Sequence, residues 1–371
     1  MSAAFVLAAG GTGGHLFPAE ALAVELIESG ARVHLLTDSR ADAFAMSLPD
    51  VAIHEVRSGR IGGGPVRAAY GLAELAAGAV QARRLLRRLA PQAVIGFGGY
   101  PSLPTMVAAA SLGLPTLIHE QNAVLGRANR RLAPRAWRIA TGFPETIGLR
   151  PLDRIRAVQT GNPVRPAILA AGWSGYRPPL PGGPVELLIL GGSQGAHILS
   201  TIVPPALAAL PSGLRAVLRV SQQARREDLA AVAKSYAETG IAAEVDSFFA
   251  DVPQRLARAH LAICRAGAST VAELAAIGRP ALLIPYPHAT DDHQTANAQA
   301  FATAGGGWVI AQADVSPDTL AARLDSHFAD AASLTIAAQR ALGFGRRDAA
   351  RHLARLALAL EPGGAVRGRA A

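Results

Sequence analysis

The sequence predicts an α/β protein with two Rossmann-like domains, each built around a parallel β-sheet. The chain has 371 residues, which is too long for one ordinary hydrophobic core. Short apolar runs alternate with helical stretches, which is typical of a parallel sheet covered on both faces. Each half of the chain begins with an apolar strand, a glycine-rich loop and a helix. Two such domains in tandem are expected to face a cleft, the usual place for a ligand.

The first half contains five predicted strands, over residues 4–9, 33–37, 51–56, 93–97 and 115–119. A helix is expected over residues 18–29, because Pro18 suits the first turn of a helix and Gly30 suits its C-terminal end.

The second half begins after a loop rich in proline and glycine, residues 173–184. Its strands are expected over residues 185–190, 216–220, 243–248, 261–264 and 281–285. We therefore expect domains at 1–163 and 164–344, with a C-terminal helix at about 345–361 that packs back onto the first domain.

The composition restricts the class of protein. The net charge of +9 favours anionic partners, although a GC-rich genome explains high Arg and Ala equally well. The single cysteine, Cys264, excludes an intrachain disulfide, and no apolar run reaches the length of a membrane span. The N-terminus lacks the features of a signal peptide. Neither a helix-turn-helix nor a zinc or aromatic RNA motif occurs, so no nucleic acid partner is expected.

The first glycine loop, residues 10–14, joins a strand to a helix N-terminus, where backbone N–H groups and the helix dipole favour a diphosphate. A tight packing turn is the simpler interpretation. A dinucleotide site is a third, supported by Asp38, but Leu16 stands where its third glycine should be. His15 follows the loop and is suited either to accept a proton from a sugar hydroxyl or to pair with a phosphate.

Three further stretches suit a nucleotide sugar. Ser193 lies in the second glycine loop, where Arg165 can reach the same diphosphate. Residues 264–273 form a strand, a small-residue turn and a helix, with Glu273 placed to accept both hydroxyls of a ribose; alternatively, Thr270 and Glu273 form a structural capping box. Residues 285–298 carry acids, amides and histidines suited to sugar hydroxyls. No Asp-x-Asp pair occurs, so no metal is expected at the leaving diphosphate.

Six motifs in order resemble the MurG family of peptidoglycan N-acetylglucosaminyltransferases, in glycosyltransferase family 28, over about residues 4–345. They are Gly10 to His15, Gly98-Gly99-Tyr100, His119-Glu120-Gln121-Asn122, Gly161 to Arg165, Gly191 to Ala196 and Cys264 to Glu273.

The resemblance implies a GT-B fold, no cofactor, and inverting transfer from UDP-N-acetylglucosamine to the C4 hydroxyl of undecaprenyl-diphospho-N-acetylmuramoyl-pentapeptide (lipid I). It implies that His15 is the candidate base and that the first glycine loop also receives the acceptor diphosphate. In the first domain, the donor would contact Thr12, Gly13, Gly14 and Asn122. In the second, it would contact Arg165, Ser193, Ala268, Ser269, Thr270, Val271, Ala272, Glu273 and Gln294.

The chain departs from the family at two places. The family's His-Gln-x-Gly motif is replaced by Ser221-Gln222-Gln223-Ala224, and the loop before Gln294 is one residue longer, so that His293 is an alternative sugar contact.

The acceptor implied by the resemblance is bound to a membrane. Residues 68–89 combine apolar side chains with Arg83, Arg84, Arg87 and Arg88, which favours a peripheral helix on anionic lipid at the cytoplasmic face of the inner membrane. A solvated helix face is the simpler interpretation of such a charge run. Two other functions stay open: a two-domain glycosyltransferase with another acceptor, and a nicotinamide-dependent oxidoreductase.

Overall fold

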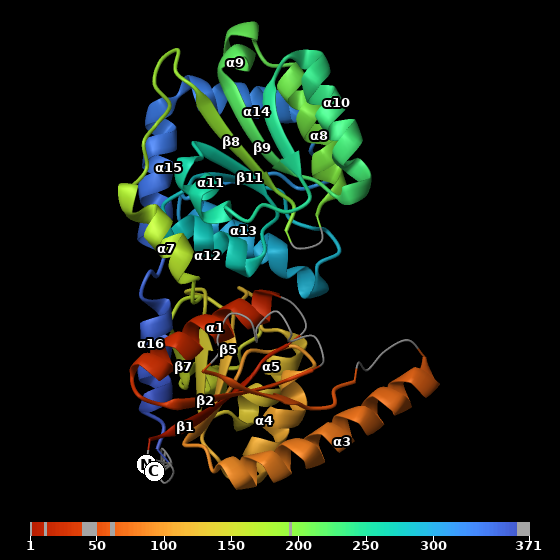
Figure 1. The fold of residues 1–371 in the computed structure, drawn as a ribbon, viewed down its shortest axis with the longest axis vertical. Helices are drawn as coiled ribbons and strands as arrows, with labels where there is room; N and C mark the ends of the chain where they lie inside the picture. Colours follow the sequence, from red (N-terminus) through yellow and green to blue (C-terminus); the bar gives the residue numbers. More distant parts are fainter. Residues whose placement is uncertain (1, 11–12, 39–49, 60–63, 193–194, 362–371) are drawn as a thin grey trace. The chain divides into compact units, whose positions relative to one another are not determined.

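The computed structural model describes residues 2–10, 13–38, 50–59, 64–192 and 195–361. The chain forms two compact units (Figure 1). The N-terminal unit comprises Met1–Arg165 and Arg347–Ala371, and the C-terminal unit comprises Pro166–Arg346.

The N-terminal unit is built on a seven-stranded sheet in the order β3-β2-β1-β4-β5-β6-β7, and all neighbouring strands are parallel. The strands are β1 (Ala4–Ala8), β2 (Arg32–Thr37), β3 (Ala52–Glu55), β4 (Ala93–Gly96), β5 (Thr116–Glu120), β6 (Arg138–Thr141) and β7 (Ala157–Gln159).

Helices cover both faces of this sheet. Successive side chains of a strand point to opposite faces, so β1 packs against helices on both sides. Phe5 and Leu7 of β1 pack on one side with helices α1 (Gly13–Glu28) and α16 (Ala349–Leu358). Val6 and Ala8 pack on the other side, with α3 (Pro65–Leu89), α4 (Ser102–Ser111) and α5 (Arg127–Leu132). A short helix, α6 (Pro151–Arg154), precedes β7.

The C-terminal unit repeats this plan with a six-stranded parallel sheet in the order β10-β9-β8-β11-β12-β13. Its strands are β8 (Val185–Leu190), β9 (Leu218–Gln223), β10 (Ala242–Asp246), β11 (Leu261–Cys264), β12 (Ala281–Leu283) and β13 (Gly307–Val309). Its helices are α7 (Pro166–Ala171), α8 (His197–Ala208), α9 (Ser212–Val217), α10 (Leu229–Thr239), α11 (Val252–Arg258), α12 (Ala268–Ala276), α13 (His293–Thr303), α14 (Pro317–Ala329) and α15 (Ala331–Phe344).

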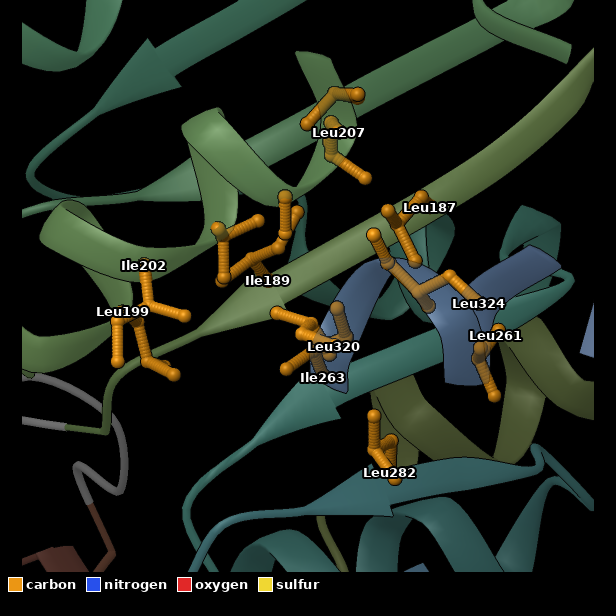
Figure 2. Close-up of a cluster of buried hydrophobic side chains, with 14 of the residues drawn as sticks. Leu187, Ile189, Leu199, Ile202, Leu207, Leu261, Ile263, Leu282, Leu320 and Leu324 are labelled. Carbon is orange, nitrogen blue, oxygen red and sulfur yellow. The ribbon is translucent and has the colours of Figure 1, made fainter. Parts of the chain in front are cut away.

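The core of this unit is aliphatic. Leu187 and Ile189 of β8 lie among leucines and isoleucines from α8, β11 and α14 (Figure 2). The parallel sheets predicted from the alternation of apolar runs and helices are therefore present in both halves of the chain.

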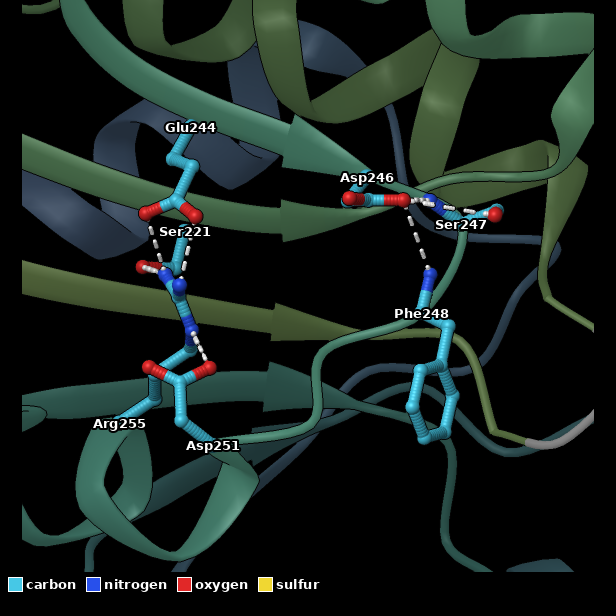
Figure 3. A network of polar contacts seen from close by, with 7 residues as sticks. All are labelled: Ser221, Glu244, Asp246, Ser247, Phe248, Asp251 and Arg255. Carbon is cyan, nitrogen blue, oxygen red and sulfur yellow. Dashed lines mark hydrogen bonds and ion pairs between the residues drawn. The ribbon is translucent and has the colours of Figure 1, made fainter.

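A polar network ties helix α11 to the edge of this sheet (Figure 3). The guanidinium of Arg255 donates to both carboxylate oxygens of Glu244 at 2.6 and 2.8 Å, to Asp251 at 2.7 Å and to Ser221 at 2.8 Å. Arg255 is only 8% exposed, so these partners compensate for the loss of water around its charge.

Most predicted strand bounds differ from the observed ones by one or two residues, and two differences have a clear physical cause. Helix α1 begins at Gly13, five residues before the predicted start, and Pro18 lies inside it. Proline is favoured at a helix start, but it is tolerated here in the interior, where residue 18 cannot donate to the carbonyl of Gly14. The predicted strand at 216–220 begins only at Leu218, because α9 continues to Val217.

In the part of the chain that the structure describes, no helix is both long enough and apolar enough to cross a membrane.

Strand β5 carries an ionisable residue into the interior of the sheet. His119 is completely buried, and its Nε2 lies 3.1 Å from the carbonyl oxygen of Gly161. Burial lowers the pKa of His119 to about 4, although the hydrogen bond to Gly161 opposes this shift. His119 is therefore neutral in the folded protein at pH 7.

We predict that His119 makes stability depend on pH. Its folded pKa lies below its ordinary value, so its contribution is complete above about pH 6.5 and is lost as pH falls toward 4. Between pH 7 and pH 5 the expected loss from this residue is about 2 kcal/mol. Urea unfolding of wild type and His119→Gln at both pH values measures it. The variant should be less stable at pH 7 but should lose about 2 kcal/mol less on acidification; equal losses in the two proteins would contradict the prediction.

Candidate functional site

The candidate residues of the N-terminal unit gather where β1, β4 and β5 end. These strands are adjacent and parallel, so the segments that follow them emerge at the same edge of the sheet. His15 follows β1 as the third residue of α1, Gly99 follows β4, and Gln121 follows β5. The chain changes direction across the sheet between β1 and β4, and ligands of parallel α/β sheets bind at such switch points.

Gln121 connects two histidines at this edge. Its Oε1 lies 3.1 Å from Nδ1 of His15. Its Nε2 lies 2.9 Å from the carbonyl oxygen of Phe97, 3.1 Å from that of His119 and 3.0 Å from Nδ1 of His119. Gln121 is only 2% exposed, so its amide is held by protein groups rather than by solvent. The sequence prediction gave this residue no role.

The glycines after β4 leave space beside His15. Gly98 and Gly99 have φ values of +86° and +74°, which side chains other than glycine rarely adopt. A Cβ atom on Gly99 would lie 3.3 Å from Cδ2 and 3.4 Å from Nε2 of His15. A glycine here therefore leaves the Nε2 edge of the imidazole uncovered on this side.

Glu120 holds the loop that carries Asn122. Its carboxylate is 2% exposed and accepts four hydrogen bonds, from the backbone N–H groups of Asn122 and Gly126 and from the amides of Asn122 and Asn129, at 2.8 to 3.3 Å. The side chain of Asn122, predicted to contact the donor, is thus anchored by Glu120. This clamp was also not foreseen from the sequence.

The other predicted residues of the N-terminal half are differently placed. Thr12 lies outside the described residues, while Gly13 and Gly14 form the first turn of α1 and not a loop. Arg165 was assigned to the second domain, but the structure groups it with the N-terminal unit. Its guanidinium lies 4.8 Å from the centre of the Phe17 ring of α1, a cation–π contact within that unit.

In the C-terminal unit, the N-terminus of α12 follows β11 beside the switch point between β8 and β11. Gly267 is the N-cap, so the N–H groups of Ala268, Ser269 and Thr270 have no acceptor within the helix. The hydroxyl of Ser269 is shielded from solvent and has no hydrogen-bond partner among the described residues. This end of the helix can therefore bind an anion. Ser193, predicted to assist there, lies outside the described residues.

The next turn of α12 clarifies two predictions. Val271 is completely buried and its N–H donates to Gly267, so it offers a ligand neither a side chain nor a donor. Ala272 and Glu273 are half-buried. The alternative that Thr270 and Glu273 form a capping box is wrong, because α12 begins at Ala268 and Thr270 is already inside it.

Gln294 joins two loops at the same edge of the sheet. Its Oε1 accepts from the backbone N–H of Ala266 at 3.2 Å and from that of Tyr286 at 3.0 Å. Its Nε2 is therefore the end directed away from these donors and can donate to a sugar hydroxyl. His293, the alternative contact, is bonded within its own turn through Nδ1 to the carbonyl of Thr290 at 2.7 Å.

Two groups beside α12 are structural. Cys264 is fully buried, which raises the pKa of its thiol to about 12, so it stays protonated at neutral pH. Arg265 donates to the carbonyls of Ile284 and Pro285 and to Gln312. No group of three or more histidine, cysteine or acidic side chains suited to a metal occurs among the described residues.

The chain matches models of one family in both halves. Residues 5–141 match the glycosyltransferase family 28 N-terminal domain, and residues 186–353 match the glycosyltransferase family 28 C-terminal domain.

Two relatives carry the name UDP-N-acetylglucosamine–N-acetylmuramyl-(pentapeptide) pyrophosphoryl-undecaprenol N-acetylglucosamine transferase. The protein from Rhodospirillum centenum is 57% identical over 95% of this chain and 93% of its own length. The protein from Rhizobium etli is 50% identical over 97% of this chain and 96% of its own length.

Solved structures are similar to this chain over nearly its whole length. MurG of Acinetobacter baumannii matches with a TM-score of 0.78 and 31% identity, over 96% of this chain and 99% of its own. A UDP-N-acetylglucosamine 2-epimerase matches with a TM-score of 0.65 at 13% identity, over 95% of this chain and 94% of its own, and shows only that the fold is shared. The fold class and the family predicted from the six motifs are confirmed: this chain belongs to glycosyltransferase family 28.

Proposed function

We propose that this chain transfers N-acetylglucosamine from UDP-N-acetylglucosamine to the C4 hydroxyl of undecaprenyl-diphospho-N-acetylmuramoyl-pentapeptide, with inversion at the anomeric carbon. The observation that carries the proposal is the identity of 50 to 57% with relatives named for this transfer, over nearly the whole chain.

His15 is proposed as the base in the N-terminal unit, which receives the acceptor. Its Nε2 takes the proton of the C4 hydroxyl while that oxygen bonds to the anomeric carbon and the bond to UDP breaks. The neutral imidazole thereby becomes an imidazolium, and UDP leaves with the electron pair of the broken bond. The open edge beside Gly99 supports this role, because a hydroxyl needs access to Nε2. We propose that Thr12, Gly13, Gly14 and Asn122 contact the donor from this unit.

The C-terminal unit is proposed to hold the donor. The free N–H groups of Ala268, Ser269 and Thr270, with the hydroxyl of Ser269, are placed to bind phosphate oxygens and to stabilise the charge of departing UDP. Glu273 accepts the ribose hydroxyls, and Nε2 of Gln294 donates to a hydroxyl of the sugar. Arg165 and Ser193 are further proposed phosphate contacts.

The first prediction from the proposed function concerns the base. His15→Gln should lower kcat for UDP release by about 10²- to 10⁴-fold, the usual contribution of a general base. The KM for UDP-N-acetylglucosamine should stay near the wild-type value, because His15 is not among the proposed donor contacts. Steady-state UDP release with a short-chain lipid I analogue measures both constants. A variant that keeps wild-type kcat would remove His15 from the mechanism.

The second prediction concerns the donor. Glu273→Ala should weaken UDP binding about 10- to 100-fold, because hydrogen bonds to a charged group contribute about 1.5 to 3 kcal/mol. Calorimetric titration with UDP measures the dissociation constant. The matched control is Glu238→Ala, because Glu238 is an exposed glutamate on α10. If both variants bind UDP like wild type, Glu273 does not hold the ribose.

Helix α3 is the proposed membrane contact. Val66, Tyr70 and Leu72 are 60 to 82% exposed, although apolar side chains are costly to expose to water. Arg84, Arg87 and Arg88 are exposed near the C-terminal end of the same helix. Beside α3, a cavity of about 630 Å³ is lined mainly by apolar side chains of α3 and α4. These features suit a peripheral position on an anionic lipid surface at the cytoplasmic face of the inner membrane.

The third prediction tests this surface with vesicles. Replacing Arg84, Arg87 and Arg88 together by alanine should weaken binding to vesicles that contain phosphatidylglycerol by about 10²-fold, since each basic residue near such a surface contributes about 1 kcal/mol. The matched control removes the same charge from Arg177, Arg226 and Arg323, which are exposed in the C-terminal unit. Equal losses for the two triple variants in a sedimentation assay would show that net charge, not α3, drives binding.

A further inference from the structure

We propose that Gln121 is a positioning residue that keeps His15 in the tautomer with its proton on Nδ1, so that the lone pair of Nε2 faces the acceptor hydroxyl. The inference rests on the proposed function, in which His15 is the base. It assigns a task to a side chain that contacts neither substrate in the proposal.

The orientation of the Gln121 amide follows from its backbone neighbours. One end of the amide lies 2.9 Å from the carbonyl oxygen of Phe97 and 3.1 Å from that of His119. Carbonyl oxygens only accept hydrogen bonds, so this end must be the NH₂ group. The opposite orientation would place Oε1 against both carbonyl oxygens in a site that is nearly closed to water.

The tautomer of His15 follows from that orientation. The end of the amide that faces His15 is Oε1, 3.1 Å from Nδ1. An amide oxygen only accepts, so Nδ1 of His15 must carry a proton to make this hydrogen bond. In a neutral imidazole the other nitrogen, Nε2, then holds the lone pair.

The lone pair is also on the accessible side of the ring. A Cβ atom on residue 99 would lie 3.4 Å from Nε2 of His15, and Gly99 carries no Cβ atom. The polar contact on Nδ1 and the open space beside Nε2 thus assign different tasks to the two nitrogens. One nitrogen fixes the ring, and the other is left to react.

His119 supports the same arrangement from behind Gln121. Its Nε2 faces the carbonyl of Gly161 at 3.1 Å and must therefore donate, which leaves Nδ1 as an acceptor for the NH₂ group of Gln121 at 3.0 Å. Burial keeps His119 neutral at pH 7, because it lowers the pKa of that residue to about 4. Neutral His119 thus agrees with the amide orientation that the two carbonyl oxygens require.

Asn162 provides a control for the role of the amide. Its Nδ2 donates to the backbone carbonyl of Gln121 at 2.8 Å, and its side chain is only 6% exposed. Removing this side chain disturbs the packing around Gln121 without touching the amide that faces His15. Asn162→Ala should therefore lower stability but leave the tautomer of His15 unchanged.

The test begins with the nitrogen resonances of His15. In uniformly ¹⁵N-labelled full-length protein, long-range proton–nitrogen correlation spectra distinguish a protonated from an unprotonated ring nitrogen, and His15→Gln identifies the signals. Wild type and Asn162→Ala should show a protonated Nδ1 and an unprotonated Nε2. Gln121→Leu, which removes the acceptor but keeps a side chain of similar size, should show a mixture of tautomers. This measurement needs no substrate, so it stays informative if lipid I is not the acceptor.

Kinetics then test the consequence for the reaction. Gln121→Leu should lower kcat about 10- to 100-fold, a part of what a positioned base contributes, with the KM for UDP-N-acetylglucosamine unchanged. Asn162→Ala should lose much less kcat at a temperature where both variants are folded.

The inference is overturned if wild-type His15 carries its proton on Nε2. It is equally overturned if Gln121→Leu is folded and keeps both the wild-type tautomer and the wild-type kcat. If the tautomers behave as expected but wild type does not turn over lipid I, the proposed acceptor fails and the assignment of Gln121 stands.

Discussion

The parallel hydrogen-bond ladder between β1, β4 and β5 is the constraint on which the candidate site depends. Ala8 pairs with Gly96, and Gly96 pairs with Ile118, so the three strands end within a few residues of one another. In a parallel sheet every strand leads its chain out at the same edge. His15, Gly99 and Gln121 are thereby brought together, although His15 and Gln121 are 106 positions apart in sequence.

Glu120, the last residue of β5, holds the segment that follows the strand through hydrogen bonds to its buried carboxylate. A carboxylate taken out of water is costly unless hydrogen bonds replace its solvent, and Glu120 accepts four of them. Asn122 and Gly126 lie on the loop between β5 and α5, and Asn129 lies in α5, so the carboxylate ties both the loop and the helix to the strand. An unpaired buried carboxylate would be unfavourable, so the hydrogen bonds to Glu120 are maintained. They keep the backbone of Gln121 in place beside His15.

The fold was largely predictable from the sequence, because long buried strands and glycine loops leave clear patterns. Strand 261–264 has the predicted bounds, but β6, β7 and β13 were missed, since none of these short strands is a run of four apolar residues. Pro18 misplaced the start of α1 because a proline inside a helix and one at its first turn look alike in sequence. The motif after β5 was noticed, yet Asn122 was chosen from it and Gln121 was not. Only the order of the strands in the sheet reveals that Gln121 reaches His15, and sequence periodicity does not contain that order.

The geometry also explains why an amide stands at position 121. A carboxylate would accept from Nδ1 of His15 as well, and it is the group that orients the histidine in many hydrolases. Here, however, the other end of the side chain meets the carbonyl oxygens of Phe97 and His119 and the lone pair on Nδ1 of His119. A carboxylate has no proton for these acceptors, and at 2% exposure the side chain is shielded from bulk water. Glutamine alone among side chains of this length accepts at one end and donates twice at the other. Gln121 can therefore fix the tautomer of His15, the proposed base, without adding the buried negative charge that a carboxylate would bring.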